Sequence, residues 1–336
     1  MEILAFDFGG TRGRCCVAGP DGSHSEVVAL AREPQDDGAR WLARLLNAGR
    51  EIVQRAGSTG GDAGELAQPA GELAQPARAN QPRSVGISFG GPVAPDGRVI
   101  SVHVPGWEKV DLVREMAKAF NLPVAIENDA NAGALGEHRF GAGRGTRFMI
   151  YFQVSTGIGG GVILDGELFR GAHGLAGEFG HMVIDPGPHA PQYATGKPGI
   201  LEALACGPAV AREGRAKLQS LGKNAPPGLT AKQVFDAARA GEAWATAVRD
   251  QVVGHLARGV AASICAYDVE RVVMGGGVTL AGDALFVPLR AAVTHYLPRY
   301  LEGKADIVPA SLGDNAPLLG AVVAAAERLR DNSKIV

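Results

Sequence analysis

The sequence predicts an α/β protein built from two related halves. Apolar strands come first and then alternate with helical patterns, once near the N-terminus and again after residue 147. Several of these strands end at a glycine-rich turn, in both halves of the chain. The chain has 336 residues, which is enough for two domains of ordinary size. We therefore expect two domains whose glycine turns are candidate binding loops.

The first half is rich in strands. Residues 2–8 are apolar and run into Gly9-Gly10, so they predict a buried strand whose hairpin partner is 14–18. The other elements expected in this half are strands over 25–31, 84–89 and 123–127, and helices over 38–56 and from 128 to 139. Residues 57–82 contain GELAQPA twice in tandem and predict a surface insertion, because two such short copies cannot stack a core. We assign this insertion no function.

The second half begins with a strongly apolar strand over 147–154, which ends at the turn STGIGGG. A hairpin around Asp165-Gly166 is expected next, and helical patterns dominate after Leu201. The later elements are a long helix over 243–267, a strand over 270–274 that leads into three glycines, and a closing helix over 315–330.

Composition excludes several classes of protein. The formal net charge is −2 and the basic residues form no block, so we expect no binding to nucleic acid. The N-terminus has no signal-peptide pattern and no apolar run could span a bilayer, so we expect a cytoplasmic protein without membrane contact. The four cysteines lack C-x-x-C spacing, which predicts free buried thiols.

Three glycine-rich turns are candidate phosphate sites: DFGGT at 7–11, STGIGGG at 155–161 and GGG at 275–277. Glycine lets the backbone approach an anion closely, and the hydroxyls of Thr11 and Thr156 add hydrogen-bond donors. Asp7 could hold Mg²⁺ directly or through water. Each turn alone also fits a tight hairpin. None matches a Walker motif, and the second turn leads into a strand, which argues against a Rossmann site.

Polar residues follow two further strands. Asn128 and Asp129 stand at a strand-to-helix junction, where either one could simply cap the helix. Asp129 also suits the acceptor of an alcohol proton in phosphoryl transfer, and Asn128 suits a contact with a sugar hydroxyl. Glu178 and His181 are three residues apart, and with Glu202 they could grip hydroxyls, which both donate and accept hydrogen bonds.

These motifs together resemble the ROK (repressor, open reading frame, kinase) family over nearly the whole chain. The matching stretches are DFGGT at 7–11, GGPVAPDGRV at 90–99, ENDANAGALGE at 127–137, STGIGGGVILDGEL at 155–168, GLAGEFGH at 174–181, MGGGV at 274–278 and DNAPLLGA at 314–321. The resemblance implies a two-lobed actin/sugar kinase/Hsp70-type fold, related to ribonuclease H, with the active site in the interdomain cleft. It implies an N-terminal lobe of 1–119 plus 316–336 and a C-terminal lobe of 120–315.

The same resemblance implies an ATP-dependent hexose kinase with Asp129 as the general base and Mg²⁺ near Asp7. It implies two sets of binding residues. The sugar set is Gly90, Gly91, Asn128, Glu178, His181 and Glu202. The nucleotide set is Asp7, Gly9, Gly10, Thr11, Arg12, Thr156, Gly157, Gly275, Gly276 and Gly277.

One departure from the family pattern concerns zinc. The family usually has three cysteines after G-E-x-G-H, but Tyr193, Thr195 and Ile200 stand at those positions here. These side chains cannot build a thiolate site, so we predict no structural zinc. Packing of Tyr193 and Ile200 would order the loop instead, and a substitute site of His181, His189 and Cys206 is the alternative.

Several alternatives stay open. A repressor of this family would carry an added DNA-binding domain ahead of the first phosphate motif, and Asp7 is only the seventh residue, so we expect a kinase. A catalytically silent sugar-binding protein and a polyphosphate-dependent kinase are two further alternatives. Glucose is the first candidate acceptor, with mannose, fructose, allose, N-acetylglucosamine and N-acetylmannosamine as others. The resemblance also implies a homodimer.

Overall fold

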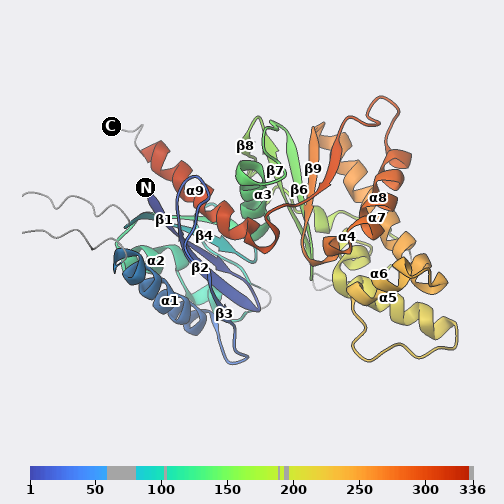
Figure 1. Ribbon diagram of the computed structural model, residues 1–336, viewed down its shortest axis with the longest axis horizontal. Coiled ribbons are helices and arrows are strands. Elements are labelled where there is room, and N and C mark those ends of the chain that lie inside the picture. Colours follow the sequence, from blue (N-terminus) through green and yellow to red (C-terminus); the bar gives the residue numbers. More distant parts are fainter. Residues whose placement is uncertain (59–80, 102–103, 188–189, 193–196, 333–336) are drawn as a thin grey trace, which may run out of the picture. The chain divides into compact units, whose positions relative to one another are not determined.

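The computed structural model describes residues 1–58, 81–101, 104–187, 190–192 and 197–332. Unit 1 of the fold contains Met1–Ala132 and Pro317–Val336, and unit 2 contains Gly133–Ala316. Each unit is a mixed five-stranded sheet covered by helices (Figure 1). This is the α/β architecture that the strand and helix patterns predicted.

The sheet of unit 1 has the strand order β3-β2-β1-β4-β5. Its strands are β1 (Glu2–Phe8), β2 (Arg12–Ala18), β3 (Val28–Ala31), β4 (Pro82–Phe89) and β5 (Val124–Asn128). The first three pair antiparallel, whereas β1, β4 and β5 are parallel. The predicted hairpin of the first two strands is therefore confirmed, and the carboxyl ends of β1, β4 and β5 meet at one edge of the sheet.

Helices cover both faces of this sheet (Figure 1). Helix α1 (Gly38–Ser58), the short η1 (Trp107–Lys109) and α2 (Leu112–Phe120) share one apolar core with β1, β2 and β4. Helix α9 (Ala316–Asn332) lies on the opposite face, where a Cβ at Gly86 of β4 would collide with the Ala321 carbonyl. Close packing of α9 on the sheet is thus the reason for glycine in the middle of β4.

Unit 2 has the strand order β10-β9-β6-β7-β8. Its strands are β6 (Met149–Val154), β7 (Ile158–Leu164), β8 (Glu167–Leu168), β9 (Arg271–Gly275) and β10 (Asp306–Pro309). Its helical elements are η2 (Phe179–His181), α4 (Leu201–Ala205), α5 (Gly207–Ser220), α6 (Ala231–Arg239), α7 (Ala243–Tyr267), η3 (Gly277–Ala281), α8 (Asp283–Tyr296) and η4 (Gly313–Asn315). Their apolar residues pack with β6, β7 and β9 in a second core.

The two sheets have the same topology, as the prediction of two related halves requires. In unit 2 the antiparallel strands are β6, β7 and β8, and β6, β9 and β10 are parallel, which repeats the pattern of unit 1. The turn after β1 in unit 1 therefore corresponds to the turn after β6 in unit 2. The glycine turns 9–10 and 155–157 occupy equivalent places in their sheets.

The boundary between the units lies later than the sequence suggested. It was expected at residue 120, but β5 pairs in parallel with β4, so that Asp129 at the start of α3 (Asp129–Phe140) belongs to unit 1. The chain passes into unit 2 inside α3, after Ala132, and returns after Ala316. Pairing of β5 with β4, which the sequence does not show, places the boundary after β5.

The structure also shows a strand that the sequence did not predict and an exposed cysteine, and one predicted segment lies outside the described residues. Strand β10 was not expected, because it has only four residues and ends in proline. Cys15, Cys16 and Cys206 are buried as expected, and burial raises the pKa of the first two thiols to about 12, but Cys265 on α7 is exposed. The GELAQPA copies at 64–70 and 71–77 lie outside the described residues.

A buried histidine in α7 should make the stability of unit 2 depend on pH. His255 is 7% exposed, and its Nδ1 atom has no hydrogen-bond partner among the residues that the structure describes. Burial, followed by the charge of Arg258, lowers its pKa below the usual 6.5, although Asp185 and Glu213 act in the opposite direction. Below pH 6.5 the unfolded chain therefore binds a proton at this histidine more readily than the folded chain does. The free energy of unfolding decreases as the pH is lowered through that range.

We expect His255→Leu to reduce this acid sensitivity. The loss of stability between pH 7.5 and 5.5 should be smaller than in the wild type, by at most about 1.4 kcal/mol per pH unit. Urea unfolding at the two pH values measures it, with the exposed His295 replaced by Leu as the matched control. Equal pH dependence in the wild type and His255→Leu would rule out His255 as the cause.

Candidate functional site

Asp7 is the next-to-last residue of β1 in unit 1. It lies directly opposite Arg14 of β2 and beside Ser88 of β4 in the strand register. Arg14 donates to its Oδ2 atom from Nη2 at 2.6 Å and from Nε at 3.1 Å, and Ser88 Oγ donates to Oδ1 at 2.8 Å. All three residues are buried. Asp7 is therefore held in a fixed orientation by a buried ion pair and a hydroxyl.

This arrangement limits how Asp7 could hold a metal ion. Two donors from Arg14 occupy Oδ2 and place a positive charge beside it, whereas Oδ1 accepts one hydrogen bond and has a second lone pair. Mg²⁺ usually keeps several waters and binds through substrate phosphates. The residues present therefore fit Mg²⁺ held on the Oδ1 side of Asp7, directly or through water. No group of three or more metal-ligating side chains occurs in the described part of the chain.

The first phosphate turn follows Asp7. The Gly9 N–H donates to the Arg12 carbonyl at 3.0 Å, which closes the turn. Arg32 Nε donates to the Gly10 carbonyl at 2.6 Å and Trp41 Nε1 to the Gly9 carbonyl at 3.3 Å. These bonds fix the backbone from the protein side, while the side chains of Thr11 and Arg12, which follow the glycines, are exposed.

Asn128 and Asp129 link the end of β5 to the start of α3. Asn128 Oδ1 accepts from the N–H groups of Ala130 and Asn131 at 2.9 and 3.3 Å, so Asn128 does cap the helix. Its Nδ2 atom donates to the Gly91 carbonyl at 3.0 Å and to Asp129 Oδ1 at 3.2 Å. A direct contact of this amide with a sugar would require one of these bonds to be exchanged.

Asp129 is oriented by its two neighbours. Its Oδ1 atom accepts from Asn128 Nδ2 and from the Ala130 N–H at 3.0 Å. Its Oδ2 atom lies on the side of Gly90, where an added Cβ would approach it to 3.9 Å. The half-buried carboxylate therefore presents one oxygen toward the Gly90-Gly91 turn. The structure brings together four predicted residues of unit 1: Gly90, Gly91, Asn128 and Asp129.

The second phosphate turn in unit 2 is also closed by a backbone bond, but it is one residue shorter than the first. The Ser155 N–H donates to the Gly157 carbonyl at 2.8 Å, which leaves Thr156 exposed at the tip. Gly275, Gly276 and Gly277 follow the neighbouring strand β9. Gly276 has φ 91°, and a Cβ there would collide with the Val154 carbonyl. The turn and the predicted adenosine motif therefore lie side by side, and only glycine fits at 276.

Glu178 directly precedes η2, His181 is its last residue, and the two form an exposed pair. Glu178 Oε2 lies 3.1 Å from His181 Nδ1, and both side chains are about two-fifths exposed. Between them, Phe179 stacks on Phe152 of β6 at 4.7 Å, and a Cβ at Gly180 would collide with the Ile158 carbonyl. The apolar and glycine residues thus seat the turn on the sheet, and the two polar side chains point outward.

Glu202 is the third predicted sugar residue of unit 2, at the start of α4. Its Oε2 atom accepts from the Ile158 N–H at 2.7 Å, so it contacts the second phosphate turn. Ile200, where the family has a cysteine, is 1% exposed and pairs with Val183 through an isolated bridge. Tyr193, Thr195 and His189 lie outside the described residues, so the absence of zinc stays a prediction.

Two residues of the site were not predicted from the sequence. Arg14 and Ser88 hold Asp7, and both are found only through strand register. A weak signal existed for Arg14, because a charged residue in the apolar run RGRCCVA needs a buried partner. Ser88 gave no such signal.

Comparison with known proteins agrees with these motifs. The model of the ROK family matches residues 71–328. A glucokinase of Thermotoga maritima is 39% identical over 254 residues, which are 73% of this chain and 80% of that protein. The ROK hexokinase of Thermus thermophilus has a TM-score of 0.81 and 30% identity, covering 98% of this chain and 100% of its own.

A third similar protein was solved with ligands. It is a ROK family glucokinase from Streptomyces griseus in complex with glucose and AMPPNP. Its TM-score is 0.77 at 26% identity, and the match covers 97% of this chain and 100% of that one. No helix among the described residues is both long and apolar enough to cross a bilayer.

Proposed function

Because this chain belongs to the ROK family, we propose that it transfers the γ-phosphoryl group of ATP to a hydroxyl of a hexose, with glucose as the first candidate. The chain is a sugar kinase of the glucokinase type with the actin/sugar kinase fold. The single observation that best supports the reaction is the orientation of the Asp129 carboxylate. Its Oδ1 atom accepts two hydrogen bonds, and its Oδ2 atom lies toward the Gly90-Gly91 turn.

Asp129 has the role of general base. Its Oδ2 atom accepts the proton of the attacking hydroxyl as the bond to phosphorus forms. The bonds from Asn128 and Ala130 prevent rotation of the carboxylate, so that the acceptor oxygen does not have to be ordered during the reaction. Asn128 acts here mainly by donating hydrogen bonds both to the Gly91 carbonyl and to the Asp129 carboxylate.

Each unit contains groups suited to the hydroxyls of a hexose. Glu178 and His181 of unit 2 form a pair that can accept from one sugar hydroxyl and donate to another. Gly90 and Gly91 of unit 1 place no side chain beside Asp129, and their N–H groups donate to the carbonyls of Phe8 and Phe89. Glucose, mannose and N-acetylhexosamines share hydroxyls that such groups recognise, so the preferred acceptor is settled by experiment.

The phosphates are assigned to the glycine turns. In each turn, backbone N–H groups and the hydroxyl of its threonine, Thr11 in unit 1 and Thr156 in unit 2, would neutralise negative charge on a bound phosphate. Arg12 adds a positive side chain beside the first turn. The adenosine is assigned to the turn 275–277, where a Cβ at Gly277 would meet only Ser155 Oγ, at 3.9 Å. Mg²⁺, held on the Oδ1 side of Asp7 directly or through water, would supply further charge neutralisation on the phosphates.

A coupled ADP-release assay with ATP and Mg²⁺ over a panel of hexoses and hexosamines tests this function. We expect sugar-dependent turnover, highest with glucose, and its loss in Asp129→Asn. Replacing ATP by polyphosphate in the same assay identifies the donor. Folded protein that turns over no sugar with either donor would be a silent sugar-binding protein instead.

The homodimer implied by the resemblance is also part of the proposal. Light scattering after gel filtration should give twice the mass of one chain. A single-chain mass at assay concentration would contradict it without affecting the proposed reaction.

A further inference from the structure

We propose that Glu202 is a positioning residue for the second phosphate turn and couples this turn to the hexose-facing pair Glu178–His181. The inference rests on the proposed function, because it assumes that residues 155–158 bind phosphate and that η2 faces the sugar. A role limited to contact with a sugar hydroxyl would leave the position of the Glu202 carboxylate against the turn unexplained.

Glu202 contacts the phosphate turn directly. Its Oε2 atom accepts from the Ile158 N–H at 2.7 Å, and a Cβ at Gly157 would lie 2.5 Å from the same oxygen. A second bond comes from the start of α5, where the Gly207 N–H donates to the Ser155 carbonyl at 2.7 Å. The turn is thus fastened at Ser155 and at Ile158, on both sides of Thr156.

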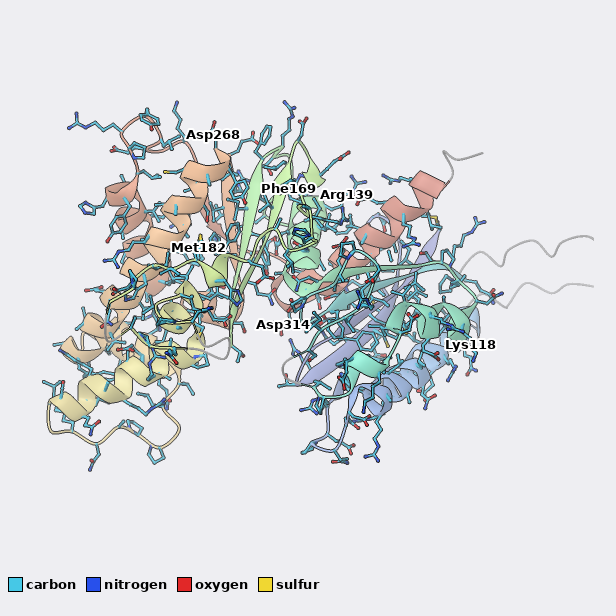
Figure 2. All side chains as sticks on the ribbon, turned by 180° about the vertical axis from the view of Figure 1, so that it is seen from behind. Lys118, Arg139, Phe169, Met182, Asp268 and Asp314 are labelled. Carbon is cyan, nitrogen blue, oxygen red and sulfur yellow. The ribbon has the colours of Figure 1, made fainter. Side chains whose placement is uncertain are left out.

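The same short helix is fastened to the sugar-facing turn. The Leu201 N–H donates to the carbonyl of Met182 at 2.9 Å, and Met182, labelled in Figure 2, directly follows His181. The close approach of Gly180 to the Ile158 carbonyl joins the two turns a second time. Helix α4 therefore connects the end of η2 with the phosphate turn through the Leu201 N–H and the Glu202 carboxylate, all within unit 2.

The chemistry of a carboxylate suits this position. It has two oxygens and about four lone-pair sites, so it can hold the Ile158 N–H and accept from a sugar hydroxyl at once. A bond between an N–H and a charged acceptor is stronger than one between neutral groups. Glu202 would thus keep the turn in its phosphate-binding shape even without sugar, and a bound hexose would stabilise the same arrangement.

Measuring nucleotide binding in the absence of sugar distinguishes positioning of the phosphate turn by Glu202 from contact of Glu202 with the sugar. The dissociation constant of a non-hydrolysable ATP analogue with Mg²⁺ is measured by calorimetry for wild type, Glu202→Ala and Glu202→Gln. We expect Glu202→Ala to raise it by about tenfold or more. Glu202→Gln should stay within about threefold of wild type, because its side-chain carbonyl can accept from the Ile158 N–H.

A second pair of variants tests the contact from the other side. Gly157→Ala should displace the Glu202 carboxylate and weaken binding of the analogue. In a Glu202→Ala background the same substitution should weaken binding much less, because the carboxylate with which the new Cβ collides is absent. This non-additivity keeps the test valid if Glu202→Ala alone folds poorly.

Wild-type analogue affinity in folded Glu202→Ala, with weakened sugar binding, would overturn the proposal. Full additivity of the Gly157 and Glu202 substitutions would also overturn it. The proposed function fails differently, since in that case the wild-type protein shows no sugar-dependent turnover although the analogue titrations still give their answer.

Discussion

Replacing Asp129 with Asn should lower kcat by about 10²–10⁴-fold, because the variant has no group to accept the proton of the attacking hydroxyl. The asparagine oxygen can still accept from the Ala130 N–H, so the start of α3 should be preserved. We therefore expect little change in KM for the sugar or in thermal stability. Steady-state kinetics of the coupled assay, with calorimetric melting of both proteins, measures the two effects separately.

A matched control comes from another aspartate at the start of a helix in unit 1. Asp111 caps α2 by accepting from the Arg114 N–H at 3.0 Å, and its side chain is exposed. Asp111→Asn should leave kcat unchanged. If Asp129→Asn also keeps the wild-type kcat, Asp129 is a helix-capping residue like Asp111 and the base has to be sought elsewhere.

Replacing Arg14 with Met should destabilise unit 1 by about 3–5 kcal/mol, because the carboxylate of Asp7 would lose its charged partner while it remains buried. The side chains of Arg14 and Asp7 are only 7% and 10% exposed, so water cannot replace the ion pair. Urea unfolding followed by tryptophan fluorescence measures this loss. A Trp244→Phe background confines the signal to unit 1, which contains Trp41 and Trp107.

The double variant Asp7→Asn/Arg14→Met separates charge from packing. It removes both charges, so we expect most of the lost stability to return, whereas the kinase should stay impaired because Asp7 is part of the phosphate motif. A stability of Arg14→Met close to that of wild type would mean that Asp7 reaches solvent or takes up a proton, and would contradict the buried ion pair described here.

The α/β class and many of the elements could be predicted from the sequence, whereas the roles of the site residues stay predictions. The apolar runs at 2–8 and 147–154 and the glycines after them predict two strands and their turns, because these signals are local in the chain. Asn128 was predicted both as a cap and as a sugar contact. Its bonds to Ala130 and Asn131 establish the cap, and its bond to Gly91 spans too much of the chain for sequence spacing to reveal.

The sequence by itself therefore determined the α/β class, the two related halves, the kinase family and the candidate base Asp129. Tertiary structure alone decided which groups hold these residues. Parallel pairing of β5 with β4 assigned Asp129 to unit 1, the register of β2 and β4 brought Arg14 and Ser88 onto Asp7, and α4 brought Glu202 onto Ile158. The physical reason is that motifs record local backbone requirements, whereas partners across a sheet depend on pairing between distant segments.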